Sequence, residues 1–408
     1  MRFHAAPPAG QWSNDPNGLV FVDGRWRLFA QHSPTGSTEA IGWGRWSSGN
    51  LLDWEWEGVA IPPDSEGLAY SGCVRSGADG LTAYLTRHQP GRQRQFRLHS
   101  GDAGTSWQQH PEPLGPEGRN VRDPFVFDWR GERFMLLAEP CDWADWAAAA
   151  STLSVWREGQ YGWTRAGTIG PWSPPGVMWE VPALLDFGDE QVLLISTVDR
   201  RHEGKTCAVT GWSGRFDGET FVRNDKEGQR LDQGDDFYAA IPAADVPLLI
   251  GWASSWATAR ERDWGGPRGG PLSLPRRYEY DEASKLLRQY PLPAALPLAI
   301  ELPAARAFAL LAGDRELVSV SVDDEIHWHI AGVHRRTAAA GDVRWQMFWD
   351  PPLLELFAST GAVATIPAST PARLIMRANG HDVQIDEAPL TPRSRGYARG
   401  GAVTARQQ

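Results

Sequence analysis

Three acidic residues stand in short motifs of the kind that form turns at the start of a strand. Asp15 lies in "SNDPNG", Asp123 in "VRDP" and Glu180 in "MWEVP", and an apolar segment follows each motif. Carboxyl groups act as nucleophiles, general acids and general bases, so three of them at one site would be equipped for acid–base and nucleophilic chemistry. Asn, Asp, Pro and Gly are also the usual residues of turns, so each motif alone has an ordinary structural interpretation.

The elements around these motifs repeat along the chain. Five segments with the pattern of a β-hairpin begin at Leu19, Tyr70, Pro124, Pro182 and Ala239, at successive intervals of 51, 54, 58 and 57 residues. A second strand pair is predicted after each hairpin, as in "GWGRWSSGNLLDWEW" and "SVWREGQYGWTRA". Together with 43 Gly, 31 Pro and little helical periodicity, this predicts an all-β chain with a five-bladed propeller over residues 1 to about 295. A sandwich with evenly spaced strands is the structural alternative.

A propeller would bring the three acids together. The first strand of every blade lines the central channel, and all five run in the same direction. The stretches before the hairpins, "SNDPNG", "LAYSG", "VRDP", "MWEVP" and "GDDFYA", are therefore expected to meet at one end of the axis. Asp15, Asp123 and Glu180 would then share a pocket. Two carboxylates across a sugar perform glycoside hydrolysis: one attacks or activates water, and the other protonates the leaving oxygen.

Composition excludes several other classes of function. A net charge of −10 and a pI near 5.5 argue against a nucleic-acid partner. No apolar stretch is long enough to cross a bilayer, and the first 14 residues lack a signal-peptide core. A cytoplasmic location is therefore expected, or a secreted one if a leader has been trimmed.

Cysteine and histidine give no sign of a disulfide or a metal centre. Cys73, Cys141 and Cys207 are odd in number and widely spaced, which predicts buried free thiols. His327 and His329 of "HWH" would share one face of a strand. No third ligand stands near them, so the sequence predicts no metal site.

The ordered motifs "WSNDPNG", "YSG", "RDP", "WEVP", "GDDFYA" and "GWASSW…PLSLPRRY" resemble glycoside hydrolase family 32, the invertases, fructanases and related β-fructofuranosidases. The resemblance covers nearly the whole chain. It implies a five-bladed β-propeller catalytic domain over residues 1–295, followed by a short C-terminal β-sandwich over residues 296–408 with a Pro-rich linker and a loose C-terminal tail. Alternating runs such as "ELVSVSV" and "LLELFASTGAVATIP" agree with sandwich strands.

The resemblance also implies a role for each acid. Asp15 would attack the anomeric carbon of a fructosyl unit, and Glu180 would be the general acid and then the base. Asp123 would hold fructose hydroxyls, with Arg122 keeping the acids ionised. Asp15 must start ionised and Glu180 protonated, so their surroundings should push their pKa values in opposite directions. A retaining mechanism further requires the two carboxyl groups to lie roughly 5 to 5.5 Å apart.

The implied activity is the release of β-D-fructose from the non-reducing end of sucrose, fructo-oligosaccharides or fructans. The partner would be this small-molecule or oligosaccharide fructoside, with no cofactor or metal, and the sequence does not indicate an oligomeric state. Further family positions expected to line the fructose or leaving-group side are Asn14, Gln31, Tyr70, Ser71, Asp236 and Trp256.

Departures from the family pattern leave the preferred substrate open. Ser13, Cys73 and Val181 stand where Met, Ser and Cys are usual, Arg45 and Trp46 replace His-Ala, and a Trp is missing from the loop "SPTGSTEAIGWG". Sucrose, its phosphate, inulin, levan and short fructo-oligosaccharides are all candidates. A fructosyltransferase would share every catalytic residue. A five-bladed glycosidase acting on arabinan or xylan, and a sugar-binding propeller without catalysis, are the remaining alternatives.

Overall fold

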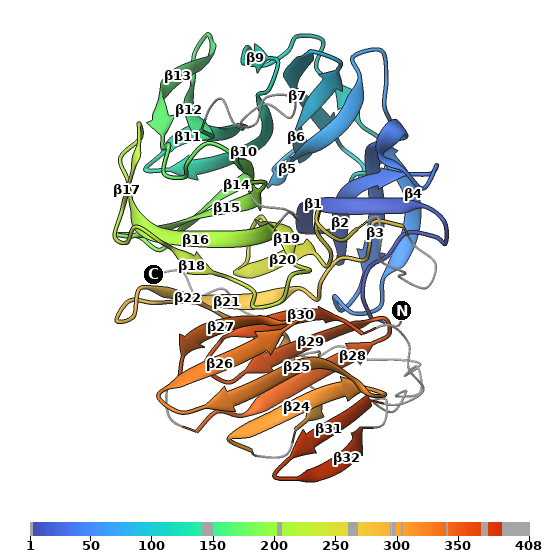
Figure 1. The fold of residues 1–408 in the computed structure, drawn as a ribbon. Helices are drawn as coiled ribbons and strands as arrows, with labels where there is room; N and C mark the ends of the chain where they lie inside the picture. The colour runs from blue at the N-terminus through green and yellow to red at the C-terminus, as the bar shows by residue number, and fades with distance from the viewer. Residues whose placement is uncertain are drawn as a thin grey trace.

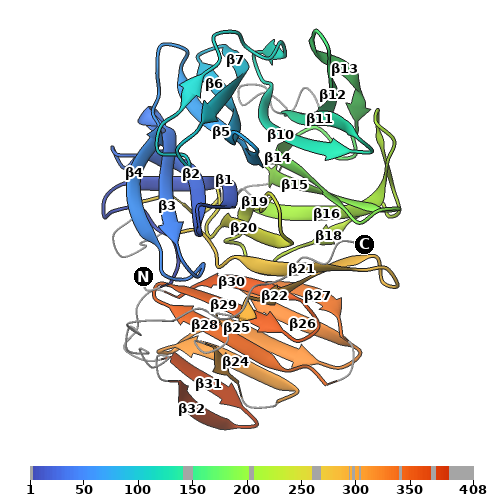
Figure 2. The ribbon, with the colours of Figure 1, turned by 180° about the vertical axis from the view of Figure 1, so that it is seen from behind.

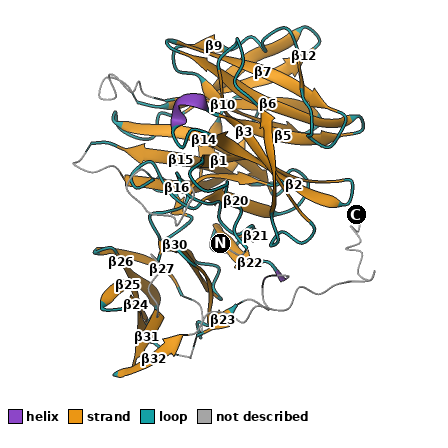
Figure 3. Ribbon diagram, turned by 90° about the vertical axis from the view of Figure 1, so that its right-hand side faces the viewer, coloured by secondary structure: helices purple, strands orange, loops and turns teal. Residues whose placement is uncertain are grey.

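The computed structural model describes residues 3–140, 150–201, 206–259, 268–293, 295, 299–302, 305–339, 342–368 and 374–385. Cys141 and the predicted C-terminal tail lie outside the described residues. The described chain forms five sheets around an axis and, beneath them, a sandwich of two sheets (Figure 1). Figure 3 shows that strands joined by loops form most of it, with a short helix, η1 (Thr38–Ala40), before the third strand. The predicted five-bladed propeller followed by a β-sandwich is confirmed.

Each blade has four main strands in chain order. The first blade contains β1 (Trp12–Val22), β2 (Arg25–Ser33), β3 (Gly42–Ser48) and β4 (Glu55–Ile61). The second contains β5 (Leu68–Gly77), β6 (Gly80–Gln89), β7 (Arg92–Ser100) and β8 (Gln108–Gln109), with β9 (Glu117–Gly118) beside β7. The third contains β10 (Arg122–Trp129), β11 (Glu132–Glu139), β12 (Thr152–Gly159) and β13 (Gly162–Ile169).

The last two blades follow the same plan. The fourth contains β14 (Val177–Asp186), β15 (Gln191–Asp199), β16 (Thr206–Phe216) and β17 (Phe221–Arg223), with β18 (Gln229–Arg230) beside β16. The fifth contains β19 (Tyr238–Pro242), β20 (Leu248–Trp252), β21 (Arg276–Asp281) and β22 (Leu286–Pro291). The innermost strands β1, β5, β10, β14 and β19 contact one another in a closed ring, in which β19 meets β1 again (Figure 2).

Local sequence explains the hairpins. The turn between β1 and β2 is Asp23-Gly24, and the turn between β10 and β11 is Arg130-Gly131. Both residues of each turn have positive φ, 50° and 75° in the first turn and 51° and 81° in the second. This is the pattern of a type I′ turn, whose twist matches that of the two strands it joins. All five predicted hairpins are present as antiparallel pairs.

Every innermost strand carries a bulge near its beginning. The pairing register shifts between Ser13 and Gly18, Ala69 and Gly72, Arg122 and Phe125, Glu180 and Ala183, and Tyr238 and Ile241. In the last three blades a residue inside the bulge has positive φ: Asp123 at 61°, Val181 at 46° and Ala239 at 50°. Consecutive side chains of a regular strand point to opposite faces, and a bulge re-aims them. Neighbouring residues can therefore both face the end of the axis.

The C-terminal part consists of two sheets packed face to face. The four-stranded sheet runs in the order β23 (Ile300–Glu301), β28 (Trp345–Asp350), β29 (Leu353–Ala358) and β30 (Val363–Pro367). The six-stranded sheet runs in the order β27 (Val333–Ala338), β26 (Glu325–Ile330), β25 (Arg315–Val322), β24 (Ala307–Ala312), β31 (Leu374–Ala378) and β32 (His381–Ile385). The predicted Pro-rich linker contains one of these strands, because Ile300 pairs with Met347 of β28. No helix of the described residues is long and apolar enough to span a membrane.

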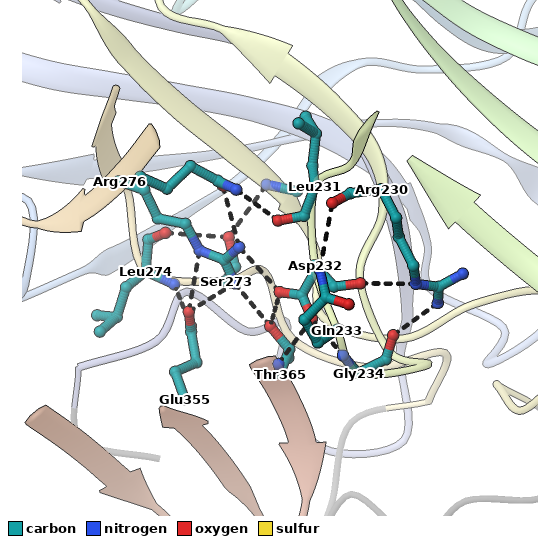
Figure 4. A network of polar contacts seen from close by, with 12 residues as sticks. Arg230, Leu231, Asp232, Gln233, Gly234, Ser273, Leu274, Arg276, Glu355 and Thr365 are labelled. Carbon is teal, nitrogen blue, oxygen red and sulfur yellow. Dashed lines mark hydrogen bonds and ion pairs between the residues drawn. The ribbon is translucent and has the colours of Figure 1, made fainter. Parts of the chain in front are cut away.

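Buried charges join the propeller to the sandwich. We call His4, Asp232, Arg276, Asp350 and Glu355 the interface cluster; these side chains are at most 2% exposed. The guanidinium of Arg276 pairs with Glu355 of β29 at 2.8 Å and with Asp232 of the propeller at 2.9 Å (Figure 4). His4 places Nδ1 2.9 Å from Asp350 Oδ2 and Nε2 3.0 Å from Glu355 Oε1. A carboxylate can only accept hydrogen bonds. His4 must therefore be an imidazolium, which donates a hydrogen bond from each of its two ring nitrogens.

We expect the stability of the protein to decrease as the pH rises above neutrality. Burial by itself would lower the pKa of His4, but the hydrogen bonds and charges of Asp350 and Glu355 raise it to about 9. The stabilisation is therefore complete below the ordinary histidine pKa of about 6.5 and is lost as the pH rises through 9, a change on the order of 3 kcal/mol. Denaturant unfolding between pH 6 and 9 measures it. In His4→Gln this part of the pH dependence should disappear, and an unchanged slope would contradict the prediction.

Candidate active site

The three acids lie together at the end of the axis where the innermost strands begin. Asp15 belongs to β1, Asp123 to β10 and Glu180 to β14, and the three residues are only 5 to 8% exposed. The charge of Glu180 acts on both aspartates, and that of Asp15 acts on Asp123. Burying several acids side by side is costly, which is a property of functional sites more often than of structural ones.

The two carboxylate oxygens of Asp15 have different surroundings. Oδ2 accepts a hydrogen bond from Ser71 Oγ at 2.7 Å. Oδ1 is buried and has no hydrogen-bond partner among the described residues. Burial and the charge of Glu180 raise the pKa of Asp15 to about 6, against the opposing effect of the neighbouring Ser71 and Asn14 side chains. We expected these surroundings to favour the carboxylate; burial and the charge of Glu180 instead move the pKa upward.

Glu180 is held from both sides. Arg122 Nη2 donates to Oε1 at 2.7 Å, and the Tyr238 hydroxyl donates to Oε2 at 2.7 Å. Burial and the charge of Glu180 raise the pKa of Tyr238 well above its usual range, so the hydroxyl remains a donor. Tyr238 belongs to the "GDDFYA" motif, for which only Asp236 was predicted to have a role. Arg122, Glu180 and Tyr238 occupy equivalent bulge positions in successive blades, 58 residues apart, so aligning the blades would have identified it.

Asp123 is fixed through its side chain and its backbone. Its Oδ2 accepts a hydrogen bond from Val181 N at 3.0 Å and lies 3.8 Å from Arg122 Nε. Its backbone N–H donates to Thr86 Oγ1 at 3.1 Å, and Thr86 donates in turn to Gln95 Oε1 at 2.6 Å. Burial raises the pKa of Asp123 to about 7 against the opposing charge of Arg122. The motifs gave no signal for Thr86 or Gln95, which belong to the neighbouring blade.

Asn14, Gln31 and Trp256 come together around Trp12. Asn14 Nδ2 donates to Gln31 Oε1, and Asn14 Oδ1 accepts from Trp12 Nε1 at 2.9 Å. The ring of Trp12 stacks on that of Trp256, with centroids 6.4 Å apart and planes at 20°. These contacts hold Gln31 against Asn14, which precedes Asp15 in the chain, and add an aromatic surface next to them.

Tyr70 and Asp236 complete the predicted set. The ring of Tyr70 stacks on His88 at a centroid distance of 4.4 Å, and burial raises its pKa. Asp236 is fully buried before β19 and accepts a hydrogen bond from Thr258 Oγ1 at 2.7 Å. This bond connects Asp236 to the segment that carries Trp256.

A thiol lies within electrostatic reach of Glu180, although Val181 stands where the family pattern has Cys. Burial and the charge of Glu180 raise the pKa of Cys207 on β16 to about 12. Cys207 and Cys73 are both buried and free, as predicted, and neither forms a disulfide.

Comparison with known proteins identifies the family. The model of the glycosyl hydrolases family 32 N-terminal domain matches residues 4–291. A levanase of Bacillus subtilis is 30% identical over 309 residues, which are 67% of this chain and 44% of that protein. A sucrose-6-phosphate hydrolase of Klebsiella pneumoniae is 32% identical over 270 residues, which are 62% of this chain and 58% of that protein. The chain thus spans about half the length of these curated relatives.

Solved structures agree on the fold. A GH32 β-fructofuranosidase of Bombyx mori has a TM-score of 0.75 at 22% identity, covering 94% of this chain and 91% of its own. An exo-inulinase of Aspergillus awamori has a TM-score of 0.74 at 19% identity, covering 94% and 96%. The propeller that carries Asp15, Asp123 and Glu180 is the part that the family model matches. The chain therefore belongs to glycosyl hydrolase family 32.

Proposed function

We propose that this protein is a retaining glycoside hydrolase that releases β-D-fructose from the non-reducing end of sucrose, fructo-oligosaccharides or fructans. The observation that carries the proposal is the asymmetry of Asp15. One oxygen is held by Ser71, and the other is buried without a hydrogen-bond partner among the described residues. Such an oxygen is desolvated and oriented, as a nucleophile needs to be. Glu180, held by Arg122 and Tyr238, supplies the second carboxyl group that glycoside hydrolysis requires.

The reaction would proceed in two steps. In the first, Glu180 takes up a proton on Oε2, and the Tyr238 hydroxyl turns from donor to acceptor of that hydrogen bond. Asp15 Oδ1 then attacks the anomeric carbon while the bond to the leaving oxygen breaks, and Glu180 gives its proton to that oxygen. The product is a fructosyl ester of Asp15. In the second, Glu180 takes a proton from water, the water oxygen attacks the anomeric carbon, and the ester bond to Asp15 breaks. Asp123 would accept hydrogen bonds from fructose hydroxyls and stabilise the positive charge of the transition state.

The names of the relatives support a fructoside substrate. The similar proteins include a levanase, a sucrose-6-phosphate hydrolase and an exo-inulinase. Three of the residues expected to line the site are linked to the acids directly: Ser71 bonds Asp15, Arg122 bonds Glu180, and Tyr70 feels the charges of Glu180 and Asp123. The fructosyl unit would be surrounded by these three together with Asn14, Gln31, Asp236 and Trp256. Polar groups that converge on a pocket orient the ligand, and an aromatic face packs against a sugar ring.

A substrate panel tests the proposed function. Free fructose and glucose would be followed over time with sucrose, kestose, inulin and levan, using the wild type and Glu180→Gln. Fructose release that Glu180→Gln abolishes supports the proposal, and the best substrate defines the subtype. Transfer of fructose to sugar in preference to water would identify a fructosyltransferase. Turnover of arabinan- or xylan-type substrates alone, or binding without turnover, would overturn it.

Tyr238→Phe is expected to lower kcat about 10- to 100-fold, because it removes a hydrogen bond to a charged group in a buried site. Kinetics over a range of pH would also show a shifted profile, which a merely structural role would not produce. Tyr278→Phe is the control, since Tyr278 is a partly buried tyrosine of β21 whose ring contacts that of Phe187. Equal effects in the two variants would contradict a direct role for Tyr238.

The pH profile should have an acid limb at an unusually high pH for a carboxylate. Asp15 must be ionised to attack, and its pKa is raised to about 6, so kcat/KM of the free enzyme should fall as the pH drops below about 6. Ser71→Ala removes a hydrogen bond that favours the charged form and should move the limb to higher pH. The assignment would be contradicted if kcat/KM fell only near the ordinary carboxyl pKa of about 4 and if this pH were the same in Ser71→Ala.

A further inference from the structure

Three histidines meet on the outer face of the six-stranded sheet of the sandwich. His327 and His329 alternate along β26, so both point to the same face. His334 lies on the edge strand β27 and pairs directly with His329. The "HWH" motif contains only the first two, and the third comes from the opposite strand of the hairpin. Tertiary structure thus supplies the neighbour that the "HWH" motif lacked.

Two imidazole nitrogens in this group face each other. His327 Nδ1 lies 3.2 Å from His334 Nε2. The two ring planes differ by only 3°, and the centroids are 5.4 Å apart. Two nitrogen ligands on a tetrahedral zinc ion, each bonded at about 2.0 to 2.1 Å, are separated by about 3.3 Å. The pair therefore already has nearly the spacing that chelation of one ion requires.

A carboxylate fixes the protonation of the first ring. Asp323 Oδ1 lies 3.1 Å from His327 Nε2, and since a carboxylate only accepts, Nε2 must donate. The neutral ring of His327 then presents a lone pair at Nδ1, to which His334 Nε2–H donates. An ion between the two nitrogens would take the place of this proton, with the neutral ring of His334 protonated at Nδ1 instead. Metal-bound histidines characteristically donate their other N–H to a carboxylate in this way.

The neighbouring charges permit a cation here. Asp323 and Glu325 are acidic, and the adjacent Arg336 is paired with Glu325 at 3.1 Å. On the next strand, Ser321 and Ser319 stand opposite His327 and His329 and add no charge.

We propose that His327 and His334 chelate a divalent transition-metal ion of the zinc type, with Asp323 orienting His327 from behind. Imidazole ligands favour zinc, copper and nickel over calcium or magnesium. Among the described residues no group of three ligating side chains is arranged around one point, so water would complete the coordination sphere. His329, whose ring centroid lies 4.6 Å from that of His334, is the nearest candidate for a third ligand after a change of rotamer. The ion would fasten the edge strand β27 to β26.

Calorimetric titration of the untagged full chain with zinc chloride at neutral pH tests the proposal. We expect saturable binding of one equivalent, weakened at least about tenfold in His327→Ala and in His334→Ala, and about 10- to 100-fold in Asp323→Asn. His381→Ala is the matched control, an exposed histidine of the same sheet on β32, and should bind like the wild type. Zinc should also raise the Tm of the wild type and not that of His334→Ala.

Two results would overturn the proposal: no saturable binding by the wild type, or binding that survives when both His327 and His334 are replaced. Because the three histidines lie on the outer face of an edge hairpin, the metal-free variants should unfold at the same temperature as the wild type. Circular dichroism and the metal-free Tm check that each variant is folded before its titration is interpreted.

Discussion

Asp15→Asn is expected to reduce kcat for fructose release by about 10⁴-fold or more, the scale seen when a catalytic nucleophile is removed. Asparagine has the same shape as aspartate and can still accept the hydrogen bond from Ser71. It has no charge and cannot form the fructosyl ester, so the loss should appear in kcat and leave the fold intact. The measurement is initial-rate kinetics on the best substrate of the panel, with Tm as the check on folding.

An activated fructoside with a good leaving group can distinguish the nucleophile, Asp15, from the general acid, Glu180. Such a leaving group needs no proton, so Glu180→Gln should recover much of its first-step rate with this substrate, whereas Asp15→Asn should not. Asp79→Asn is a suitable control, because Asp79 is exposed in the turn between β5 and β6. Fructose release by Asp15→Asn at close to the wild-type rate would remove Asp15 from the mechanism.

Glu355→Gln should destabilise the whole protein by about 3 to 5 kcal/mol, the usual result of removing one partner from a buried charge network. Glu355 accepts from Leu274 N, from Arg276 and from His4, and it is completely buried. The substitution leaves two buried cations short of a partner. Because Arg276 belongs to β21 of the propeller and Glu355 to β29 of the sandwich, the effect should reach both parts.

Denaturant unfolding followed by tryptophan fluorescence measures this change. Glu55→Gln is the control, since Glu55 pairs with Arg25 at 2.8 Å with both side chains exposed, and such pairs contribute at most about 1 kcal/mol. A loss in Glu355→Gln no larger than in the control would show that the interface cluster is not what holds the sandwich to the propeller.

The blade structure was predictable because it is encoded locally. Turns such as Asp23-Gly24 and Arg130-Gly131 favour hairpins through their own conformational preferences, and the alternation of apolar residues identifies the strands between them. A four-stranded unit that repeats five times has few compact arrangements. The number of predicted hairpins and the spacing between them were therefore enough to predict a propeller. The beginning of the sandwich was harder to locate, because Ile300 and Glu301 form a strand inside a stretch whose prolines predict a linker.

From the amino-acid sequence we could identify the chemical groups and their order along the chain, with Asp15, Asp123 and Glu180 near the beginning of the first strands of three blades. Which of their atoms come into contact depends on the folded structure. The bulge of each innermost strand re-aims residues that regular alternation would point apart, and its geometry depends on neighbouring blades. Contacts such as Tyr238 with Glu180, or His334 with His327, join strands whose local sequences contain no information about each other. These contacts form when the propeller closes and when the strands of a hairpin pair. Burial and hydrogen bonding depend on which groups are close in space, and not on which are close in the chain.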